Sequence, residues 1–243
     1  MTRFMMLVVG CLLVGMSDTQ AWPDKTMRMV VPFAASGTTD AIARLVAQGL
    51  SMRLGQSMIV ENVPGAAGNI GAALVAKTVP DGYTILMATP GQAVMNQFMY
   101  SRMPYDTATA FMPLAYIASA PSVLVVSPAL NVASVRALLA YAKDRPDGAT
   151  FGSAGMGSTG HLGGLLLSKR TDMNATHVPY RGSAPMLQDL IAGQIQFTID
   201  TVPGVMSFIQ SGTLQPLAIT GKSRSPALPD VVPVVNRILL VGG

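Results

Sequence analysis

The stretch MRMVVPFAASGTTDAIARLVAQGLSMRL, residues 27–54, contains the unit that decides the fold. Its first part, Met27–Phe33, is a short apolar run typical of a buried strand. A loop of small residues follows, and Thr38 or Thr39 can then cap a helix that runs through Leu54. Because a strand, a small-residue loop and an amphipathic helix occur in this order, the stretch predicts the first half of a βαβ unit.

The same unit recurs along the chain, with turn signals such as Pro80-Asp81-Gly82 between the repeats. Further strands are expected at Met58–Glu61, Thr84–Ala88, Val123–Ser127, Thr150–Ser153, Thr176–Val178, Gln196–Asp200 and Leu214–Thr220. Helices are expected at Ile70–Thr78, Ser134–Asp144, Gly160–Arg170 and Ser183–Ala192. This alternation predicts an α/β protein with mostly parallel sheets.

The composition excludes several classes of protein. Of the 243 residues, 50% are apolar and only 12% are charged, which argues against a disordered chain. The net charge is +4, and the positive residues are scattered without a Lys/Arg run, so no nucleic-acid partner is expected. Outside the N-terminus, no apolar stretch is long enough to predict a spanning helix.

The first 21 residues resemble a secretory signal peptide. Arg3 gives the positive start, Phe4–Met16 is the apolar run, and Thr19-Gln20-Ala21 suits a leader peptidase. We expect cleavage after Ala21 and a periplasmic mature protein without disulfides, because Cys11 is the only cysteine. Lipid attachment at Cys11 and a buried N-terminal helix are the alternatives.

Loops of small residues follow the predicted strands, where open α/β sheets bind ligands. These loops are Ala34–Asp40, Ala88–Gly91, Gly152–Gly160 and Pro179–Ser183. Several lead into a helix N-terminus, where free N–H groups and the helix dipole favour an anion. The alternative is that every strand-to-helix loop needs glycine and a Ser or Thr cap.

Several chemical motifs are incomplete. Gly155–Gly160 matches G-x-G-x-x-G, but no acid follows the next strand, so a dinucleotide site is not expected. His161 could contact a ligand or only pack locally, and His177 is expected in the core; their spacing does not suit a metal. A Ser–His–Asp set from distant residues stays open. Asp200, at a strand end, faces either a ligand or a structural partner.

Motifs in order along the chain carry a family resemblance. They include Val31-Pro32-Phe33-Ala34-Ala35-Ser36-Gly37-Thr38-Thr39-Asp40, Val60-Glu61-Asn62-Val63-Pro64-Gly65-Ala66-Ala67-Gly68-Asn69-Ile70-Gly71, Pro80-Asp81-Gly82-Tyr83, Phe151-Gly152-Ser153-Ala154-Gly155, His177-Val178-Pro179-Tyr180-Arg181-Gly182 and Arg224-Ser225-Pro226-Ala227-Leu228-Pro229-Asp230-Val231. The chain resembles the Bug family of extracytoplasmic solute receptors of tripartite tricarboxylate transporters.

The resemblance implies a type II periplasmic-binding-protein fold, with two lobes and an interlobe cleft. Lobe 1 would span residues 22–121, lobe 2 residues 122–220, and a crossover with an atypical tail residues 221–243. The implied ligand is a small carboxylate, such as a di- or tricarboxylate or an amino-acid-like acid. Candidate ligand-binding residues are Ala35, Ser36, Gly37, Thr38, Asp40, Thr89, Ser153, Ala154, Gly155, Ser158, Thr159, His161, Tyr180, Gly182 and Asp200.

The chain departs from the family pattern at several positions. Ser36-Gly37 replaces a usual Gly-Gly, so Ser36 would be strained if its φ is positive. Gly160 replaces a common Ser, and Val232–Gly243 does not fit the expected end, which predicts a C-terminally truncated receptor.

We therefore expect a monomeric, non-enzymatic receptor without cofactor or metal, whose partners are a small carboxylate and the transporter's membrane permease subunits. A non-functional truncated receptor and an exported enzyme acting on a carboxylic acid are the alternatives.

Overall fold

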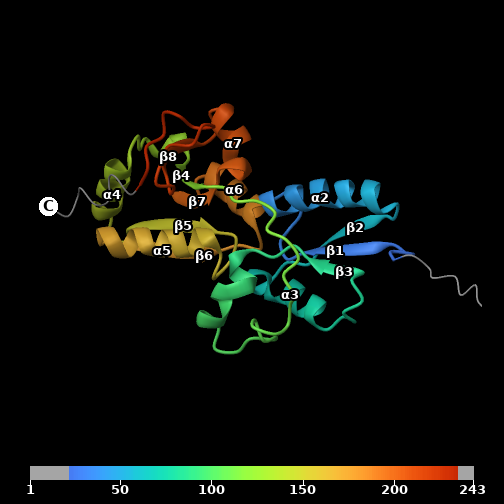
Figure 1. Cartoon of the computed structure of the whole chain (residues 1–243). Coiled ribbons are helices and arrows are strands. Elements are labelled where there is room, and N and C mark those ends of the chain that lie inside the picture. The colour runs from blue at the N-terminus through green and yellow to red at the C-terminus, as the bar shows by residue number, and fades with distance from the viewer. Residues whose placement is uncertain (1–21, 235–243) are drawn as a thin grey trace, which may run out of the picture.

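The computed structural model describes residues 22–234, which form two α/β lobes side by side (Figure 1). The predicted signal peptide, with Cys11 and the cleavage site, and residues 235–243 lie outside the described residues. We use lobe 1 for the part built on strands β1–β3 and lobe 2 for the part built on β4–β8.

Lobe 1 has a three-stranded parallel sheet in the order β2-β1-β3. Its elements are β1 (Met27–Val31), α2 (Thr38–Leu54), β2 (Met58–Asn62), η1 (Ala66–Gly68), α3 (Asn69–Ala76), β3 (Thr84–Leu86), the π-helical turn η2 (Gly91–Met95) and η3 (Asn96–Phe98). Alternate residues of β1 pack against Ala43 and Ala47 of α2, so the apolar face of α2 closes one side of this small core.

Lobe 2 has a five-stranded sheet in the order β6-β5-β7-β4-β8. Its elements are β4 (Ser122–Val126), η4 (Pro128–Leu130), α4 (Val135–Lys143), β5 (Ala149–Ser153), α5 (Thr159–Thr171), β6 (Ala175–Pro179), α6 (Ser183–Ile191), β7 (Phe197–Thr201), α7 (Val202–Gln210) and β8 (Gln215–Ile219). Apolar clusters cover both faces: Phe151 and Leu138 belong to one, and Met186 and Val205 to the other.

Most predicted elements are confirmed within about two residues, but three details differ. Strand β4 runs antiparallel to both β7 and β8, which the alternation of elements did not indicate. Helix α7 was not predicted; Pro203 stands in its first turn, where proline loses no hydrogen bond. Neither Thr38 nor Thr39 caps α2, since its N-cap is Gly37 and no side chain caps the helix.

Candidate ligand-binding site

The predicted small-residue loops meet where the two lobes touch, a region that we call the junction. The Ala34 amide donates to the Arg181 carbonyl at 3.3 Å. The hydroxyl oxygens of Thr38 and Thr201 lie 2.9 Å apart, and the Tyr100 hydroxyl donates to the Met156 carbonyl at 3.2 Å. Loops far apart in the sequence, on different lobes, therefore come together as expected.

In lobe 1, Asp40 organises the loop that precedes α2. The Asp40 side chain is buried and accepts hydrogen bonds from the Ser36 amide (2.9 Å), Arg44 Nε (3.0 Å) and Asn62 Nδ2 (2.9 Å). Burial by itself raises the pKa of Asp40, but these donors and the Arg44 charge outweigh it, and the pKa lies below its ordinary value. Asp40 and the Ser36 amide therefore stabilise the loop by bonding to each other.

The strain expected at Ser36 is present. Its φ is 68°, in the left-handed region that non-glycine residues rarely adopt. The hydrogen bond from the Ser36 amide to Asp40 holds this conformation. Since the amide is occupied, Gly37 and Thr38 carry the free amides nearest to the junction.

In lobe 2, the Ser153 hydroxyl points inward. Ser153 is completely buried, and its Oγ lies 2.7 Å from His177 Nε2 and 3.0 Å from the Gly155 carbonyl oxygen. The Gly155 amide also donates to this Oγ, at 3.2 Å. The hydroxyl therefore closes the turn at Gly155, where the sequence led us to expect a ligand contact.

His161 and His177 form a stacked pair behind the same loop. Their ring centroids lie 4.1 Å apart, and His161 Nδ1 accepts a hydrogen bond from the Gly157 amide at 3.0 Å. Burial lowers the pKa of both, and repulsion from His161 helps to bring the pKa of His177 to about 4. Both rings are therefore neutral near pH 7 and hold the loop by hydrogen bonds; His177 does more than fill the core.

Three further candidates are occupied by internal hydrogen bonds. The Ser158 hydroxyl caps α5 by accepting from the His161 amide. The Thr89 hydroxyl donates to Gln92 Oε1 at 2.8 Å. The Tyr180 hydroxyl donates to Asp189 at 2.7 Å. Burial, and to a smaller extent the neighbouring Asp189, raises the pKa of Tyr180 to about 12. These side chains position backbone at the junction.

Asp200, in contrast, is only half satisfied. Its Oδ1 accepts from the Thr201 amide at 2.7 Å, while its Oδ2 is buried without a hydrogen-bond partner in the described structure. Burial raises the pKa of this carboxyl, and this outweighs the opposing influence of Ser183 and Thr201.

The glycines of the candidate set allow close approach. Gly182, with φ at 140°, packs on Ala34 of the other lobe, and a Cβ there would lie 3.2 Å from the Ala34 amide nitrogen. Gly155 similarly approaches Ala67. At Gly160, a Cβ would lie 2.5 Å from the Ile199 carbonyl oxygen, so α5 packs on β7 more closely than a serine allows.

A buried polar cluster in lobe 1 was missed by the sequence analysis. Gln92 Nε2 donates to the Ala67 carbonyl, and Asn96 Nδ2 donates to Asn69 Oδ1 at 2.7 Å. Asn96 Oδ1 is buried, has no hydrogen-bond partner among residues 22–234, and lies close to Gly157 of lobe 2. The one available signal was the spacing of Gln92 and Asn96, four residues apart in a helical turn.

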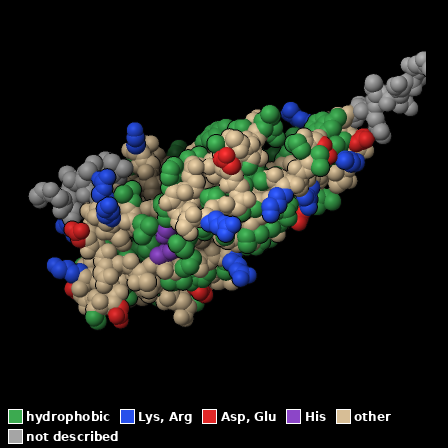
Figure 2. All heavy atoms as spheres, turned by 90° about the horizontal axis from the view of Figure 1, so that it is seen from below, with side chains coloured by type: hydrophobic (Ala, Val, Ile, Leu, Met, Phe, Trp, Pro, Cys, Tyr) green, Lys and Arg blue, Asp and Glu red, His purple; other side chains and the backbone are tan. Residues whose placement is uncertain are grey.

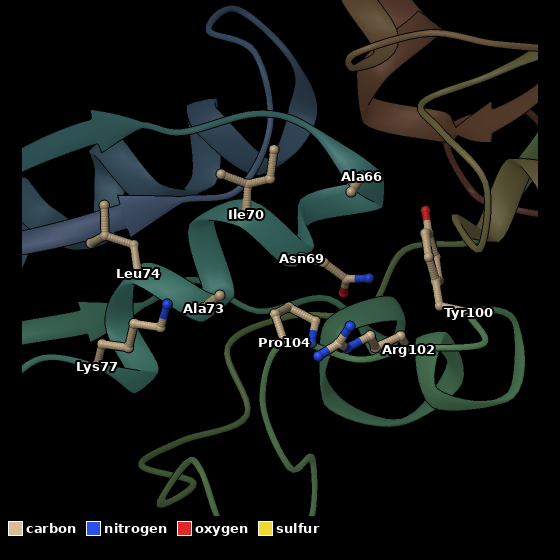
Figure 3. A pocket seen from close by; sticks show the side chains of 9 residues that line it. All are labelled: Ala66, Asn69, Ile70, Ala73, Leu74, Lys77, Tyr100, Arg102 and Pro104. Carbon is tan, nitrogen blue, oxygen red and sulfur yellow. The ribbon is translucent and has the colours of Figure 1, made fainter.

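A groove of about 490 Å³ runs along α3 (Figure 3). Asn69, Tyr100 and Arg102 lie on its walls, and no residue of the candidate set lines it. Figure 2 shows one face of the molecule, on which the basic side chains are dispersed and histidine atoms reach the surface among apolar ones. Within residues 22–234, no cluster of three or more potential metal ligands occurs, and no helix is long and apolar enough to cross a membrane.

The sequence of this chain matches the model of a known protein family. Residues 42–239 match the TctC model, described as a tripartite tricarboxylate transporter family receptor. The chain belongs to the TctC family. The resemblance drawn from the sequence is confirmed.

Curated relatives of this TctC chain agree with the match. It is 38% identical over 222 residues to a UPF0065 protein of Pseudomonas sp. strain P51, which covers 91% of this chain and 66% of the relative. It is 35% identical over 215 residues to protein BugT of Bordetella pertussis, and this match covers 88% of this chain and 66% of BugT. The chain therefore spans just under two thirds of the length of these relatives.

Solved structures confirm the type II periplasmic-binding-protein-like fold. An R. palustris protein with adipate superposes with a TM-score of 0.86 at 43% identity, over 88% of this chain and 72% of that one. The periplasmic binding protein BugD superposes with a TM-score of 0.84 at 32% identity, over 89% of this chain and 72% of BugD. MatC from Rhodopseudomonas palustris, with bound malate, superposes with a TM-score of 0.82 at 30% identity, over 88% of this chain and 73% of MatC.

Proposed function

We propose that this TctC-family chain is a periplasmic receptor that binds a small carboxylate at the junction and delivers it to the permease subunits of a tripartite tricarboxylate transporter. The observation that carries the proposal is a set of uncapped helix N-termini. Helices α2, α6 and α7 begin at Thr38, Ser183 and Val202, and none has a side-chain cap. Thr38 and Thr201 bring the starts of α2 and α7 within hydrogen-bond distance.

Uncapped N-termini favour an anion for two reasons. Their first N–H groups have no partner inside the helix, and the helix dipole places partial positive charge there. The ends of α2 and α6, one from each lobe, can offer such donors to a ligand without an ion pair, whereas the first amide of α7, at Val202, already donates to the Pro121 carbonyl. The adipate and malate in two related structures are anions of the class that this arrangement suits.

The residues proposed to contact the ligand are those whose polar groups stay free. They are the backbone of Ala35, Gly37, Thr38, Ala154 and Gly182, and the side chain of Thr159. The Gly155 amide and the Thr38 hydroxyl are instead held by Ser153 and Thr201. Ser36, Asp40, Thr89, Ser153, Ser158, His161 and Tyr180 are proposed as positioning residues, because internal partners occupy their polar atoms.

The contact between Ser153 and His177 raises the alternative that the protein is a hydrolase. The 2.7 Å contact resembles a nucleophile with its base. However, Ser153 has no exposed surface, and within residues 22–234 no carboxylate is hydrogen-bonded to either imidazole. A receptor role accounts for the same contact as support for the Gly155 turn.

Thermal unfolding with adipate, malate and the neutral amide adipamide tests the proposal. A carboxylate receptor should be stabilised by about 2.7 kcal/mol at 100 times the dissociation constant, and adipamide should have no effect. NMR of the same mixtures separates the alternative, because an enzyme would convert the compound. Equal stabilisation by adipamide would contradict anion recognition.

N-terminal sequencing of the protein from a periplasmic extract tests the proposed location. The chain should begin at Trp22, because Thr19-Gln20-Ala21 suits the leader peptidase. A lipid-modified Cys11 in the membrane fraction would contradict cleavage at that position.

A further inference from the structure

The loop between β5 and α5 touches lobe 1 at two neighbouring residues. The Met156 carbonyl accepts a hydrogen bond from the Tyr100 hydroxyl at 3.2 Å, and Gly157 packs on Asn96. The same loop contains Ala154, whose backbone is proposed above to contact the ligand. The shape of this loop therefore affects both the contact between the lobes and the binding of a carboxylate.

One hydrogen bond to a histidine fixes the backbone of this loop. His161 Nδ1 accepts from the Gly157 amide at 3.0 Å, and Gly157 has a φ of 87°, which glycine adopts at little cost. Since a backbone N–H can only donate, this contact requires an unprotonated Nδ1. A proton at Nδ1 would set two N–H groups against each other and break the contact.

The second histidine makes this position hard to charge. The ring centroids of His161 and His177 lie 4.1 Å apart, so two positive charges there would repel each other. His161 is buried, and burial lowers its pKa. Burial, and to a smaller extent repulsion from His161, lowers the pKa of His177 to about 4. Histidine atoms reach the surface (Figure 2), so protons from solvent have access to the pair once its packing loosens.

Among residues 22–234, no charged side chain is placed to stabilise a proton on this pair. Strands β5 and β6 contain no Asp, Glu, Lys or Arg. On β7, Ile199 packs on Gly163 of α5, so its neighbour Asp200 faces the other side of the sheet. The other titratable or charged residues of the adjoining segments are Lys169, Arg170, Tyr100, Arg102 and Arg181. None of them contributes to the pKa of either ring, which depends on burial and on the pair itself.

A second acceptor for the Gly157 amide lies in lobe 1. Asn96 Oδ1 is buried and has no hydrogen-bond partner among residues 22–234, and a Cβ at Gly157 would lie 2.4 Å from this oxygen. Protonation of His161 would leave the buried Gly157 amide without an acceptor, which costs free energy unless the amide turns to another one. The loop therefore has two hydrogen-bonding arrangements, one for each protonation state of His161.

We propose that His161 is a proton-sensitive positioning residue, which holds the Gly157 amide and the carboxylate-binding loop while Nδ1 is unprotonated and releases the loop and the ligand on protonation. This inference rests on the proposed carboxylate-receptor function and adds regulation by pH to it. Because coupling is reciprocal, a ligand that binds the unprotonated form must lower the pKa of His161 by the same factor by which acid lowers the affinity.

Proton NMR of the wild-type chain measures this coupling. The sequence has only two histidines, so protein made without a histidine tag gives two imidazole C2 signals, which the variants below assign. The signals are followed from pH 8 to 5, with and without a saturating excess of ionised adipate or malate. The His161 midpoint should fall by at least about half a pH unit on binding, a threefold change. An unchanged midpoint, or a ring that stays unprotonated throughout both titrations, would overturn the inference. A raised midpoint would also overturn it, because the ligand would then pair with the imidazolium.

His161→Asn is the conservative variant, because its Oδ1 offers an acceptor in place of Nδ1 and takes up no proton. Calorimetric titrations at pH 7 and pH 5 compare each protein with its own affinity at pH 7. The wild type should lose at least about threefold more affinity than His161→Asn. Ionisation of the ligand is the same for both proteins and cancels in this comparison. Equal losses would overturn the inference.

His177→Gln is the matched control, since glutamine can still hydrogen-bond to Ser153 and His161 still titrates. Its loss of affinity between pH 7 and pH 5 should equal that of the wild type. A loss that only His177→Gln removes would overturn the assignment to His161. If neither adipate nor malate binds at pH 7, the proposed function fails and this inference fails with it, whereas binding that does not depend on His161 and pH overturns the inference alone.

Discussion

Ser36 shows how a single residue is held against its own preference. A serine at φ 68° costs about 1–2 kcal/mol relative to a relaxed conformation, and the Asp40 carboxylate offsets this by accepting from the Ser36 amide. The turn aims Gly37 and Thr38 at the junction. At this scale, buried polar side chains serve the shape of the loops, and backbone groups are left for the ligand.

Replacing Ser36 with glycine should relieve this strain. We expect the free energy of unfolding to rise by about 0.5–1 kcal/mol, because the relief exceeds the extra entropy of glycine in the unfolded chain. Urea denaturation measures the change. Gly55→Ser, at φ 69° in open space, makes the reverse exchange and should destabilise by about 1 kcal/mol. A less stable Ser36→Gly would show that the serine side chain stabilises the turn.

Replacing Ser153 with alanine should affect stability and binding together. The change leaves the Gly155 amide and His177 Nε2 without their partner, which costs about 1–3 kcal/mol. Because the Gly155 turn then loosens, carboxylate affinity should fall roughly tenfold, a loss of about 1.4 kcal/mol. Denaturation and calorimetry on the same preparation measure both. Loss of affinity at unchanged stability would indicate a direct ligand contact.

At the scale of elements, helix α5 and strands β5 and β6 form one packed unit. Gly164 of α5 packs against the Phe151 ring of β5, and a Cβ at Gly164 would lie 2.2 Å from that ring. This closeness brings His161 of α5 onto His177 of β6. The unit therefore anchors the loop between β5 and α5 through two neutral imidazoles.

Acid should destabilise this unit. The folded-state pKa of His177 is lowered from 6.5 to about 4, so the unfolded chain binds more protons between these values. The contribution of neutral His177 to the free energy of unfolding is therefore fully present above about pH 6.5 and is lost as the pH falls toward 4. The loss amounts to up to about 3 kcal/mol, at 1.4 kcal/mol per pKa unit. Urea denaturation from pH 7 to 4 measures this loss.

His177→Gln is the matched variant for the acid effect. Glutamine cannot take up the proton but can still hydrogen-bond to Ser153, so this variant should lose less stability across the same range. A slope equal to that of the wild type would assign the acid sensitivity to other groups.

At the scale of the whole molecule, the two lobes differ in how well their sheets are covered. The five strands of lobe 2 lie between two apolar clusters, and β4 is buried along its length. In lobe 1, Ile59 on edge strand β2 is 59% exposed, and β3 is only partly buried. Apolar surface left in water adds nothing to the stability of a lobe, so lobe 1 should open more readily than lobe 2.

Hydrogen exchange tests this difference. Amides of β2 and β3 should exchange faster than those of β5 and β7, because fewer apolar contacts oppose their opening. A saturating carboxylate should slow exchange in Ala34–Asp40 and Gly152–Gly160 together. Equally slow exchange in both sheets without ligand would contradict the predicted difference. The division into lobes of residues 22–121 and 122–220 stays a prediction that the same data would test.

The sequence by itself determined the alternation of elements and the family. Periodic apolar residues and small-residue loops are local features, so β1, α2 and most other elements could be located within about two residues. The family motifs also identified the loops that meet at the junction, such as Ala34–Asp40 and Gly152–Gly160. These features depend on neighbouring residues and need no knowledge of distant contacts.

Only the tertiary structure decided which candidate groups are free. Ser153 and Tyr180 look available in the sequence, but His177 and Asp189 occupy them. Asp200 looks no different from Asp40 in the sequence, yet Asp40 accepts from three donors, whereas in residues 22–234 Asp200 accepts from the Thr201 amide through Oδ1 and its Oδ2 has no hydrogen-bond partner. The physical reason is that a hydrogen bond depends on distance and direction between atoms from distant segments, which local patterns do not encode.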